Sequence, residues 1–286
     1  MFGDLSVVVL SHGRIDALPR TLSHLAEEIE EDDVEVIIVD NSGDEKLDAI
    51  LDRFEEAYPE WVIIRNRSNV GVSEGRNQGW VESTRPFILA MDDDITWSRD
   101  EVIAMLHLAR SRPQVGIVSP VIVDAASGRI LNPCTSRQGG KGLPSFYEGC
   151  FLLSRRAMNA VGVLDPTLTR AGEGLDYAIR LKKAGFAIVR ACDARVAHYD
   201  RDREGSEKGI RRHEWMWSFA LVYFKHLPGP LAAARTAWVW AAHVRRGTTR
   251  HGLAWVLDLT RAACAGARAG RESAGAPPPE GLGSRE

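Results

Sequence analysis

Apolar positions in the first 120 residues follow two periods in alternation. Short continuous apolar runs, such as LSVVVL at residues 5–10, are typical of strands that are buried on both faces of a parallel sheet. Between these runs, apolar residues recur at helical spacing, as at Leu18, Leu22 and Leu25. The expected strands cover residues 5–10, 34–39, 61–65, 87–91 and 115–119, and the expected helices cover residues 15–29, 47–57, 72–83 and 99–110. Strands separated by helices predict right-handed crossovers and a mostly parallel sheet covered on both faces.

The pattern changes in the second half of the chain. We expect a hairpin at 121–131, turning at Ser127 and Gly128, and then a mobile loop at 132–144, which is rich in Gly, Pro, Ser and Lys. The later expected elements are strands at 151–153 and 186–190, and helices at 172–184, from 210 onwards, near 231–244 and near 253–267. Residues 270–286 have almost nothing to bury, so we expect disorder there.

Composition limits the classes of protein that the chain can be. Its 286 residues are 44% hydrophobic and 26% charged, a balance typical of a globular protein with a buried core. A net charge of -3 argues against a general nucleic-acid binder, so we expect no nucleic-acid partner. No apolar run reaches the roughly 18 to 20 residues of a membrane span, and no basic stretch precedes the first apolar segment, so we expect no signal peptide and a cytoplasmic location.

The four cysteines are Cys134, Cys150, Cys192 and Cys264, and none of them is closely spaced with another. Zinc and redox motifs need such close spacing, so the sequence predicts neither kind of site. We expect the four thiols to be small buried hydrophobic groups that stay reduced.

Polar residues follow each of the first four expected strands. They are the segment from Ser11 to Arg14, then Asp40, then Asn69 with Arg76, and then Asp92 to Asp94. Ligands of an open parallel sheet bind beyond the carboxyl ends of its strands. Four polar strand ends therefore predict one ligand-binding rim.

The consecutive carboxylates of Asp92, Asp93 and Asp94 repel one another, and a hard cation such as Mg²⁺ or Mn²⁺ would hold them together at a strand end. The alternative is a helix-capping acid with neighbours on a solvated turn. Asp40 can accept hydrogen bonds from a ribose or a base, and Arg76 can reach a diphosphate in a bidentate contact. Their alternatives are a turn-forming aspartate and a surface arginine.

Seven stretches of the chain carry a family resemblance. They are VVVLSHGR (7–14), EVIIVDNSG (35–43), IRNRSNVGVSEGRNQG (64–79), FILAMDDDIT (87–96), EGCFLLSRRAMNAVGVLDP (148–166), GEGLDYAIRLKKAGF (172–186) and ARVAHYD (194–200). In this order they resemble glycosyltransferase family 2, a group with the α/β GT-A fold that includes bacterial rhamnosyltransferases. The resemblance covers roughly residues 5 to 228.

The resemblance implies roles for the rim residues. The donor, a nucleoside-diphosphate sugar, would be bound by Ser11, Arg14, Asp40, Asn69, Arg76, Asp92 and Asp93. Asp92 and Asp94 look like the family's Asp-x-Asp pair, which holds Mg²⁺ or Mn²⁺ and, through it, the diphosphate. His198 matches a histidine that supplies a further metal or phosphate contact in some members, although it could equally be an ordinary strand-end histidine.

The chain departs from the family at the catalytic base. Members usually carry a Glu-Asp pair at the start of the helix expected at 172–184, and the Asp deprotonates the acceptor hydroxyl in inverting enzymes. Here Glu173 is followed by Gly174, with Asp176 two residues later. Three interpretations stay open: Glu173 is the base, Asp176 is the base, or no carboxylate serves. Both acids would also favour the dipole of a first helical turn.

The implied function is a metal-dependent, inverting glycosyltransferase of the hexosyltransferase type. Its donor would be a UDP-, dTDP- or GDP-sugar, and its acceptor a hydroxyl on a glycan, a lipid-linked sugar or a small molecule. Because of Gly174, the alternative is a catalytically degenerate nucleotide-sugar-binding protein. A nucleotidyltransferase is disfavoured, since residues 11–14 lack a glycine-rich phosphate loop.

We expect a catalytic domain at residues 1–208, with a nucleotide-sugar-binding half at 1–119 and an acceptor half at 120–208. A helical extension would follow at 209–269, and a disordered tail at 270–286. Between Lys225 and Arg271, eight Lys and Arg residues face one acid, Asp258. Basic helices with tryptophan can lie on an anionic membrane, here the inner face, and the alternatives are packing on the core or on a second subunit as a homodimer.

Overall fold

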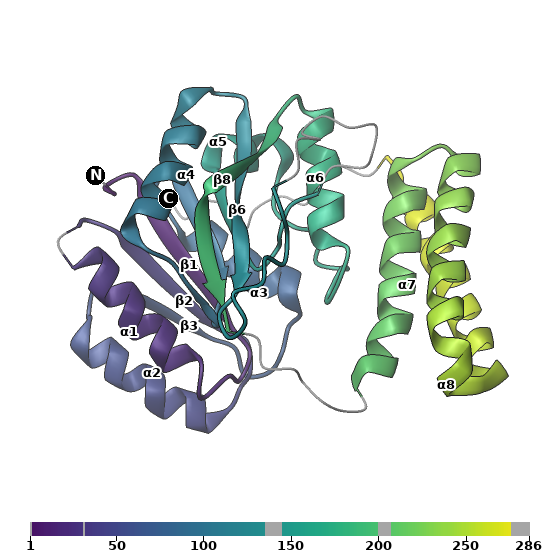
Figure 1. Ribbon diagram of the computed structural model, residues 1–286, viewed down its shortest axis with the longest axis horizontal. Helices are drawn as coiled ribbons and strands as arrows, with labels where there is room; N and C mark the ends of the chain where they lie inside the picture. Colours follow the sequence, from purple (N-terminus) through teal and green to yellow (C-terminus); the bar gives the residue numbers. More distant parts are fainter. Residues whose placement is uncertain (1, 31, 135–144, 200–206, 276–286) are drawn as a thin grey trace.

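The computed structural model describes residues 2–30, 32–134, 145–199 and 207–275. Within these residues, eight strands form one sheet in the order β3-β2-β1-β4-β7-β6-β8-β5 (Figure 1). The strands are β1 (Leu5–Ser11), β2 (Glu35–Asp40), β3 (Val62–Arg65), β4 (Phe87–Asp92), β5 (Ile95–Thr96), β6 (Val115–Asp124), β7 (Cys150–Ser154) and β8 (Ala187–His198). The helices are α1 (Leu18–Ile29), α2 (Glu45–Ala57), α3 (Val72–Glu82), α4 (Arg99–Ser111), α5 (Arg155–Val161), α6 (Glu173–Lys183), α7 (Glu207–His226) and α8 (Gly229–Glu272).

Strands β1 to β4 form the parallel half of the sheet, as the apolar runs predict. In the register, Ser11 of β1 lies beside Asp40 of β2, and Asp40 lies beside Arg65 of β3. On the other side of β1, Leu10 lies beside Asp92 of β4. The carboxyl ends of these four strands therefore lie at one edge of the sheet, and the expected α/β fold is confirmed.

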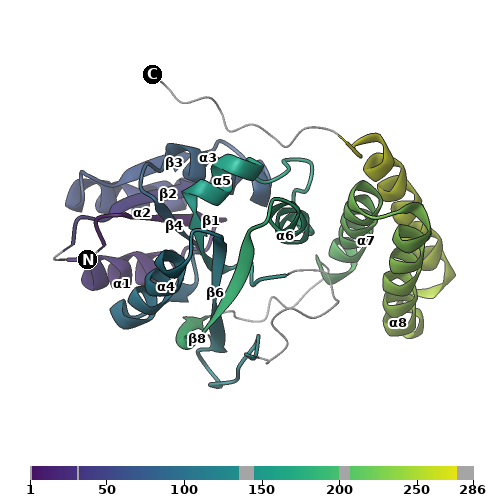
Figure 2. The same ribbon diagram turned by 90° about the horizontal axis from the view of Figure 1, so that it is seen from above.

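The sheet separates two helical layers (Figure 2). Side chains alternate along β1, so that Val7 and Val9 pack with α1, α2 and α4, while Val8 and Leu10 pack with α3, α5 and α6. Burial on both faces is the reason that β1 has no polar alternation in its sequence.

Helix α3 lies unusually close to the sheet. A Cβ atom added at Gly79 would overlap the side chain of Val8, so only glycine lets the helix approach to this distance. The close approach places Arg76, one turn earlier on α3, beside the carboxyl ends of the strands.

The second half of the sheet is mixed, and here the sequence-based elements need correction. β7 pairs antiparallel with both β4 and β6, and β8 runs on to His198 rather than ending at residue 190. In β8 the buried residues Ala191, Ala194 and Val196 alternate irregularly with exposed charges, so no continuous apolar run marks the strand. β5 and α5 were also not expected. The expected hairpin after β6 is present, with an antiparallel bridge between Val123 and Ile130 and a backbone hydrogen bond from Leu131 N to Ile122 O.

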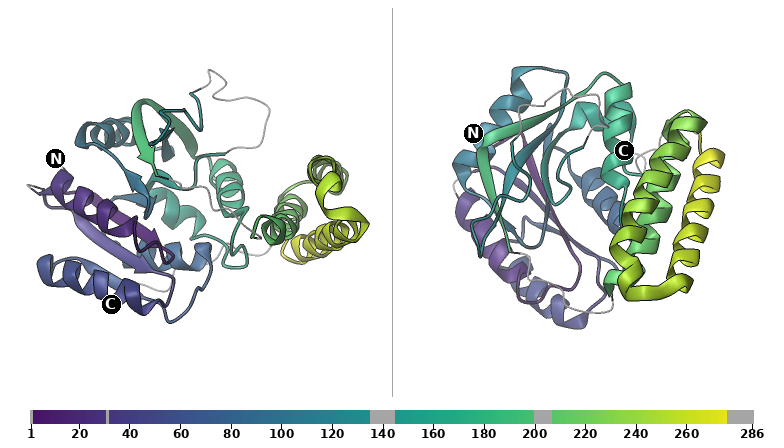
Figure 3. Two further views of the ribbon diagram at one scale, coloured as in Figure 1. Left: turned by 60° about the horizontal axis from the view of Figure 1, so that its bottom comes forward. Right: turned by 45° about the vertical axis from the view of Figure 1, so that its right-hand side comes forward.

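Helices α7 and α8 lie beside α6, away from the sheet (Figure 3). Leu221 and Val222 of α7 pack against Ile179 of α6. α8 is helical throughout its span, yet Trp240 Nε1 donates a hydrogen bond to Thr260 Oγ1 at 3.1 Å, so the chain reverses direction between these residues. No helix among the described residues is long and apolar enough to cross a membrane.

The expectation that all four cysteines are buried and reduced is wrong, and so is the expectation that disorder begins at residue 270. Cys134 and Cys192 form a disulfide between the segment after the hairpin and β8, although they lie 58 residues apart. Both are exposed, whereas Cys150 is a buried thiol and Cys264 an exposed one. Residues 270–272 belong to α8 and are not disordered, while residues 276–286 and most of the expected loop, 135–144, lie outside the described residues.

Candidate active site

The buried carboxylate of Asp93 joins the ends of β1 and β4. Ser11 Oγ donates to Asp93 Oδ2 at 2.6 Å, the backbone N–H of His12 donates to the same oxygen at 3.3 Å, and Arg14 Nε lies 3.4 Å from Oδ1. Burial raises the pKa of Asp93 to about 6, although the hydrogen bond from Ser11 and the charge of Arg14 oppose that rise. Three of the predicted donor-binding residues, Ser11, Arg14 and Asp93, are thus brought together.

Asp94 is fully buried and lies on the side of the rim next to β8. Its Oδ2 is paired with the guanidinium of Arg14 and lies 3.3 Å from His198 Nε2. The short strand β5 makes this contact, because Ile95 pairs with His198 on β8. Oδ1 of Asp94 is buried without a hydrogen-bond partner among the described residues.

Asp92 is more exposed than its two neighbours and faces α3. Arg76 Nη2 donates to Asp92 Oδ1 at 2.8 Å, and Arg76 itself is only 4% exposed. Burial opposes the charge of Arg76, but the negative charges of Asp92 and Glu173 outweigh that effect and raise the pKa of the guanidinium. Its Nε is buried without a partner among the described residues, so one donor of Arg76 stays available to a ligand.

Asp40 lies at the end of β2 and is 1% exposed. Its Oδ1 accepts from the N–H of Ser42 at 2.8 Å and from Ser42 Oγ at 2.6 Å. Its Oδ2 is buried and has no partner among the described residues. A buried carboxylate oxygen that lacks a partner is costly, and a ligand N–H or O–H would satisfy it.

Asn69 lies in the loop after β3 and is tied to the same edge through Asn41. Asn41 Nδ2 donates to Asn69 Oδ1 at 3.2 Å, and Asn69 Nδ2 lies 3.2 Å from His12 Nε2. His12 Nδ1 is 2.9 Å from the carbonyl oxygen of Asn41, so the loops after β1, β2 and β3 form one connected wall.

The predicted metal ligands are Asp92, Asp94 and His198, and only Asp94 and His198 lie in contact. Within the described ranges, no three Asp, Glu, His or Cys side chains form a group that could hold a metal ion. The donor set nevertheless fits Mg²⁺ or Mn²⁺ in kind, because carboxylate and imidazole groups meet here and Asp94 Oδ1 lacks a partner.

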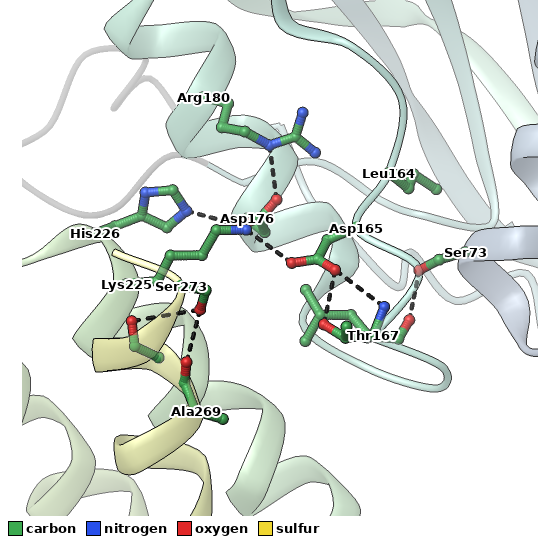
Figure 4. Close-up of polar contacts among 12 residues, drawn as sticks. Ser73, Leu164, Asp165, Thr167, Asp176, Arg180, Lys225, His226, Ala269 and Ser273 are labelled. Atoms are coloured by element: carbon green, nitrogen blue, oxygen red, sulfur yellow. Dashed lines mark hydrogen bonds and ion pairs between the residues drawn. The ribbon is translucent and has the colours of Figure 1, made fainter. Parts of the chain in front are cut away.

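Asp176, a predicted alternative base, points towards Lys225 and His226 of α7 (Figure 4). Its carboxylate is held by Arg180 Nε at 2.7 Å, Lys225 Nζ at 2.9 Å and His226 Nε2 at 2.7 Å. Burial raises the pKa of Asp176, but the hydrogen bond from His226 and the charges of Arg180 and Lys225 outweigh it and lower the pKa well below its usual range. Asp176 thus joins α6 to α7.

Glu173, the other predicted base, does lie at the rim. It is 4% exposed, and its carboxyl group hydrogen-bonds that of Glu148, which lies in the turn before β7. Burial, followed by the charge of Glu173, raises the pKa of Glu148 to about 8. Sequence reasoning did not select Glu148. Its only sequence signal is its place at the start of the segment EGCFLLSRR, directly before a buried strand.

Two bacterial proteins are similar to part of the chain. An uncharacterized glycosyltransferase of Haemophilus influenzae is 30% identical over 115 residues, which are 40% of this chain and 37% of the relative. A pre-mycofactocin glycosyltransferase of Mycobacterium tuberculosis is 26% identical over 215 residues, which are 69% of this chain and 43% of the relative. The chain thus spans less than half the length of these two relatives.

Solved structures share the fold at low sequence identity. The mannosyltransferase PcManGT of Pyrobaculum calidifontis, in complex with GDP-Man and Mn²⁺, aligns with a TM-score of 0.59 and 15% identity over 95% of this chain and 85% of that one. TarS of S. aureus, residues 1–349 with UDP-GlcNAc, aligns with a TM-score of 0.62 and 15% identity over 91% and 79%. These likenesses show a GT-A glycosyltransferase fold.

The family assignment comes from the sequence itself. The model of the family described as glycosyl transferase family 2 matches residues 6–161, which is more than half of the chain and includes β1 to β4 with the whole Asp92–Asp94 segment. The chain therefore belongs to glycosyl transferase family 2.

Proposed function

We propose that this chain transfers a sugar from a nucleoside-diphosphate donor, bound along the rim of β1 to β4, to a hydroxyl acceptor, with inversion at the anomeric carbon and with a divalent cation. One observation carries the proposal: acids and arginines that are separate in sequence are buried together at this rim, with polar atoms left unsatisfied. Buried polar atoms without partners are rare in proteins, and a polar ligand explains them.

The unsatisfied atoms divide the rim into two parts. Asp40 Oδ2 is the acceptor at the end of β2, where it suits a base N–H or a ribose hydroxyl. Arg76 Nε is a donor on the α3 side, where it suits a phosphate oxygen. The nucleoside would therefore lie towards β2 and β3, and the diphosphate towards β4.

Charge balance supports the divalent cation. The site contains the acids Asp92, Asp93, Asp94, Glu148 and Glu173. Arg14 and Arg76 are the arginines that pair with them, so the acids outnumber the arginines before any diphosphate is bound. Asp92, Asp94 and His198 are the residues that would hold Mg²⁺ or Mn²⁺. When bound, the cation would neutralise the charge that develops on the leaving nucleoside diphosphate.

The donor is to be identified with a panel of UDP-, dTDP- and GDP-sugars, with dTDP-rhamnose among them. We expect at least one donor to bind in calorimetry with Mn²⁺ or Mg²⁺ and to release its nucleoside diphosphate, and EDTA to abolish that release. Asp94→Asn should weaken binding of this donor, whereas Asp100→Asn, at an exposed acid of α4, should not. The NMR spectrum of the sugar product reports the anomeric configuration, and retention would contradict an inverting reaction.

The opposite outcome is equally clear. If the wild-type chain binds no donor of the panel with either cation, the proposed donor site is wrong. If it binds a donor tightly but never releases the diphosphate, the chain is the degenerate binding protein that Gly174 suggests.

We also propose that α8 contacts an anionic membrane surface. Trp238 is 70% exposed and Leu231 47% exposed on its first half, and Arg245 is exposed on the same half. The segment from Lys225 to Arg271 carries eight Lys and Arg residues and one acid, so its charge is complementary to anionic lipids.

A further inference from the structure

Glu148 and Gly174 compete for one volume at the first turn of α6. A Cβ atom added at Gly174 would overlap Cγ, Cδ and Oε1 of Glu148. The carboxyl group of Glu148 therefore lies where the side chain of residue 174 would begin, and the chain can place a carboxyl group there from only one of the two positions.

The turn that carries Glu148 is fixed to the rim. The backbone N–H of Asp92 donates to the carbonyl oxygen of Gly149 at 2.9 Å. A Cβ atom at Gly149 would lie 3.1 Å from Asp92 Oδ2, so the turn passes directly over this carboxylate. The charges of Asp92, Glu173 and Glu148 all act on Arg76, which places these groups around one guanidinium.

Most other acids near the rim are already engaged. Asp93 is held by Ser11, His12 and Arg14, and Asp94 by Arg14. Asp92 accepts from Arg76, and Asp176 is held by its three partners on the side of α7. Asp40 is held by Ser42 at the end of β2. Glu148 and Glu173 remain, and their carboxyl groups are hydrogen-bonded to each other.

Exposure distinguishes the two members of the pair. Glu173 is 4% exposed, whereas Glu148 is partly exposed in a turn. A base must contact the hydroxyl that it deprotonates, so the member that reaches solvent is the one that an acceptor can touch.

We propose, on the basis of the function proposed above, that Glu148 is the catalytic base and that Glu173 is a positioning residue that holds it. In the reactive state the proton shared by the pair lies on Glu173, which donates its hydrogen bond to Glu148. The ionised carboxylate of Glu148 then takes the proton of the acceptor hydroxyl, and the acceptor oxygen forms a bond to the anomeric carbon. The bond from that carbon to the diphosphate oxygen breaks, and its electron pair leaves with the nucleoside diphosphate. The family resemblance puts the base at residue 174 of α6, and Glu148 supplies a carboxyl group to that place from the turn before β7.

The central experiment is the release of nucleoside diphosphate from the donor that the panel identifies, with water as acceptor, together with calorimetric binding of the same donor. Glu148→Gln keeps the size of the side chain and removes its basicity. We expect it to lower turnover about 100-fold, the usual effect of losing a general base, with the Kd of the donor changed less than about threefold. Glu56→Gln, at an exposed glutamate of α2, is the matched control and should leave both unchanged.

A relocation experiment separates chemistry from structure. Glu148→Ala should lose turnover, and Gly174→Asp should lose it too, because its new side chain overlaps Glu148. The double variant Glu148→Ala with Gly174→Asp should regain at least tenfold over Glu148→Ala alone, since it returns a carboxylate to the same volume. A purely structural role for Glu148 would not predict this rescue.

Two results would overturn the proposal. In the first, Glu148→Gln keeps its turnover while Glu173→Gln loses it, which would make Glu173 the base. In the second, the double variant binds donor with wild-type Kd and melts at the wild-type temperature, yet turns over no faster than Glu148→Ala. Failure of the wild-type chain to bind any donor would overturn the proposed function and this inference together, whereas unchanged turnover in Glu148→Gln would overturn the inference alone.

Discussion

His226, the last residue of α7, donates from Nε2 to Oδ1 of Asp176 on α6 across 2.7 Å. Lys183 Nζ lies 3.2 Å from His226 Nδ1 and can donate to it, which leaves the proton on Nε2. Lys225 completes the contact, because its ammonium group lies 2.9 Å from Asp176 and 2.8 Å from Asp165 (Figure 4). A single buried carboxylate thus joins the catalytic core to the C-terminal helices.

Asp176→Asn is expected to destabilise the chain without abolishing turnover. The variant leaves the buried Arg180 without its charged partner, whereas Lys225 keeps its pair with Asp165. Breaking a buried ion pair costs about 3 kcal/mol. The midpoint of urea unfolding at pH 7 should fall accordingly. Donor turnover per folded molecule should stay near wild type, because this carboxylate faces α7 and not the rim. Asp258→Asn, in an exposed helical pair with Arg261, is the control and should not move the midpoint.

The stability difference between wild type and Asp176→Asn should depend on pH. Burial raises the pKa of Asp176, but its three partners lower it below the ordinary value of 3.8, so the folded state holds the carboxylate ionised more strongly than the unfolded state. The contribution to stability is therefore complete above 3.8 and is lost as the pH falls below that value. The groups that face this carboxylate are Arg180, Lys225 and His226.

The measurement is the midpoint of urea unfolding of wild type and of Asp176→Asn, taken from neutral pH to below 3.8. We expect the difference between the two midpoints to be constant at neutral and mildly acidic pH and to shrink below the ordinary pKa of an aspartate. A gap that widens on acidification would show that Asp176 is not held as the anion.

The parallel half of the sheet and its rim could be predicted because the signals are local. A strand buried on both faces is a continuous apolar run, and Asp40 and Asp92 directly follow such runs. Because β1 pairs in parallel with β2 and with β4, these residues lie at one edge of the sheet.

The remainder of the site depends on contacts that the sequence does not encode locally. Glu148 and Gly174 lie 26 positions apart, and neither residue alone indicates that one side chain fills the space over the other. The sequence shows Asp176 only as an acid in the first turn of a helix. Its carboxylate points to Lys225 and His226, which lie on a helix that begins 31 residues later.

Asp40→Asn is expected to weaken donor binding through the nucleoside. Oδ2 of Asp40 is buried without a partner, so a ligand N–H or O–H would form a charge-assisted hydrogen bond there, worth about 1.5 to 3 kcal/mol. The Kd should rise about 10-fold to 100-fold, and by the same factor for the donor and for the free nucleoside diphosphate. Calorimetry with both ligands measures this, and Asp52→Asn at an exposed acid of α2 is the control. A loss confined to the sugar-bearing donor would place Asp40 at the sugar instead.

Trp238→Ser is expected to weaken binding to anionic vesicles. Trp238 is 70% exposed on a basic helix, and its ring would leave water when the helix lies at the lipid surface. The affinity for phosphatidylserine-containing vesicles, measured by cosedimentation, should fall about tenfold, which is the effect of losing one large apolar contact. Arg245→Gln should lower it further only at low salt, because lipid charge is screened by ions. Ile130→Ser, at an apolar side chain that is 43% exposed in the hairpin after β6, should have no effect. Equal binding to neutral vesicles would contradict the role of anionic lipid. A concentration-dependent dimer that Trp238→Ser dissociates would assign this surface to a second copy of the chain.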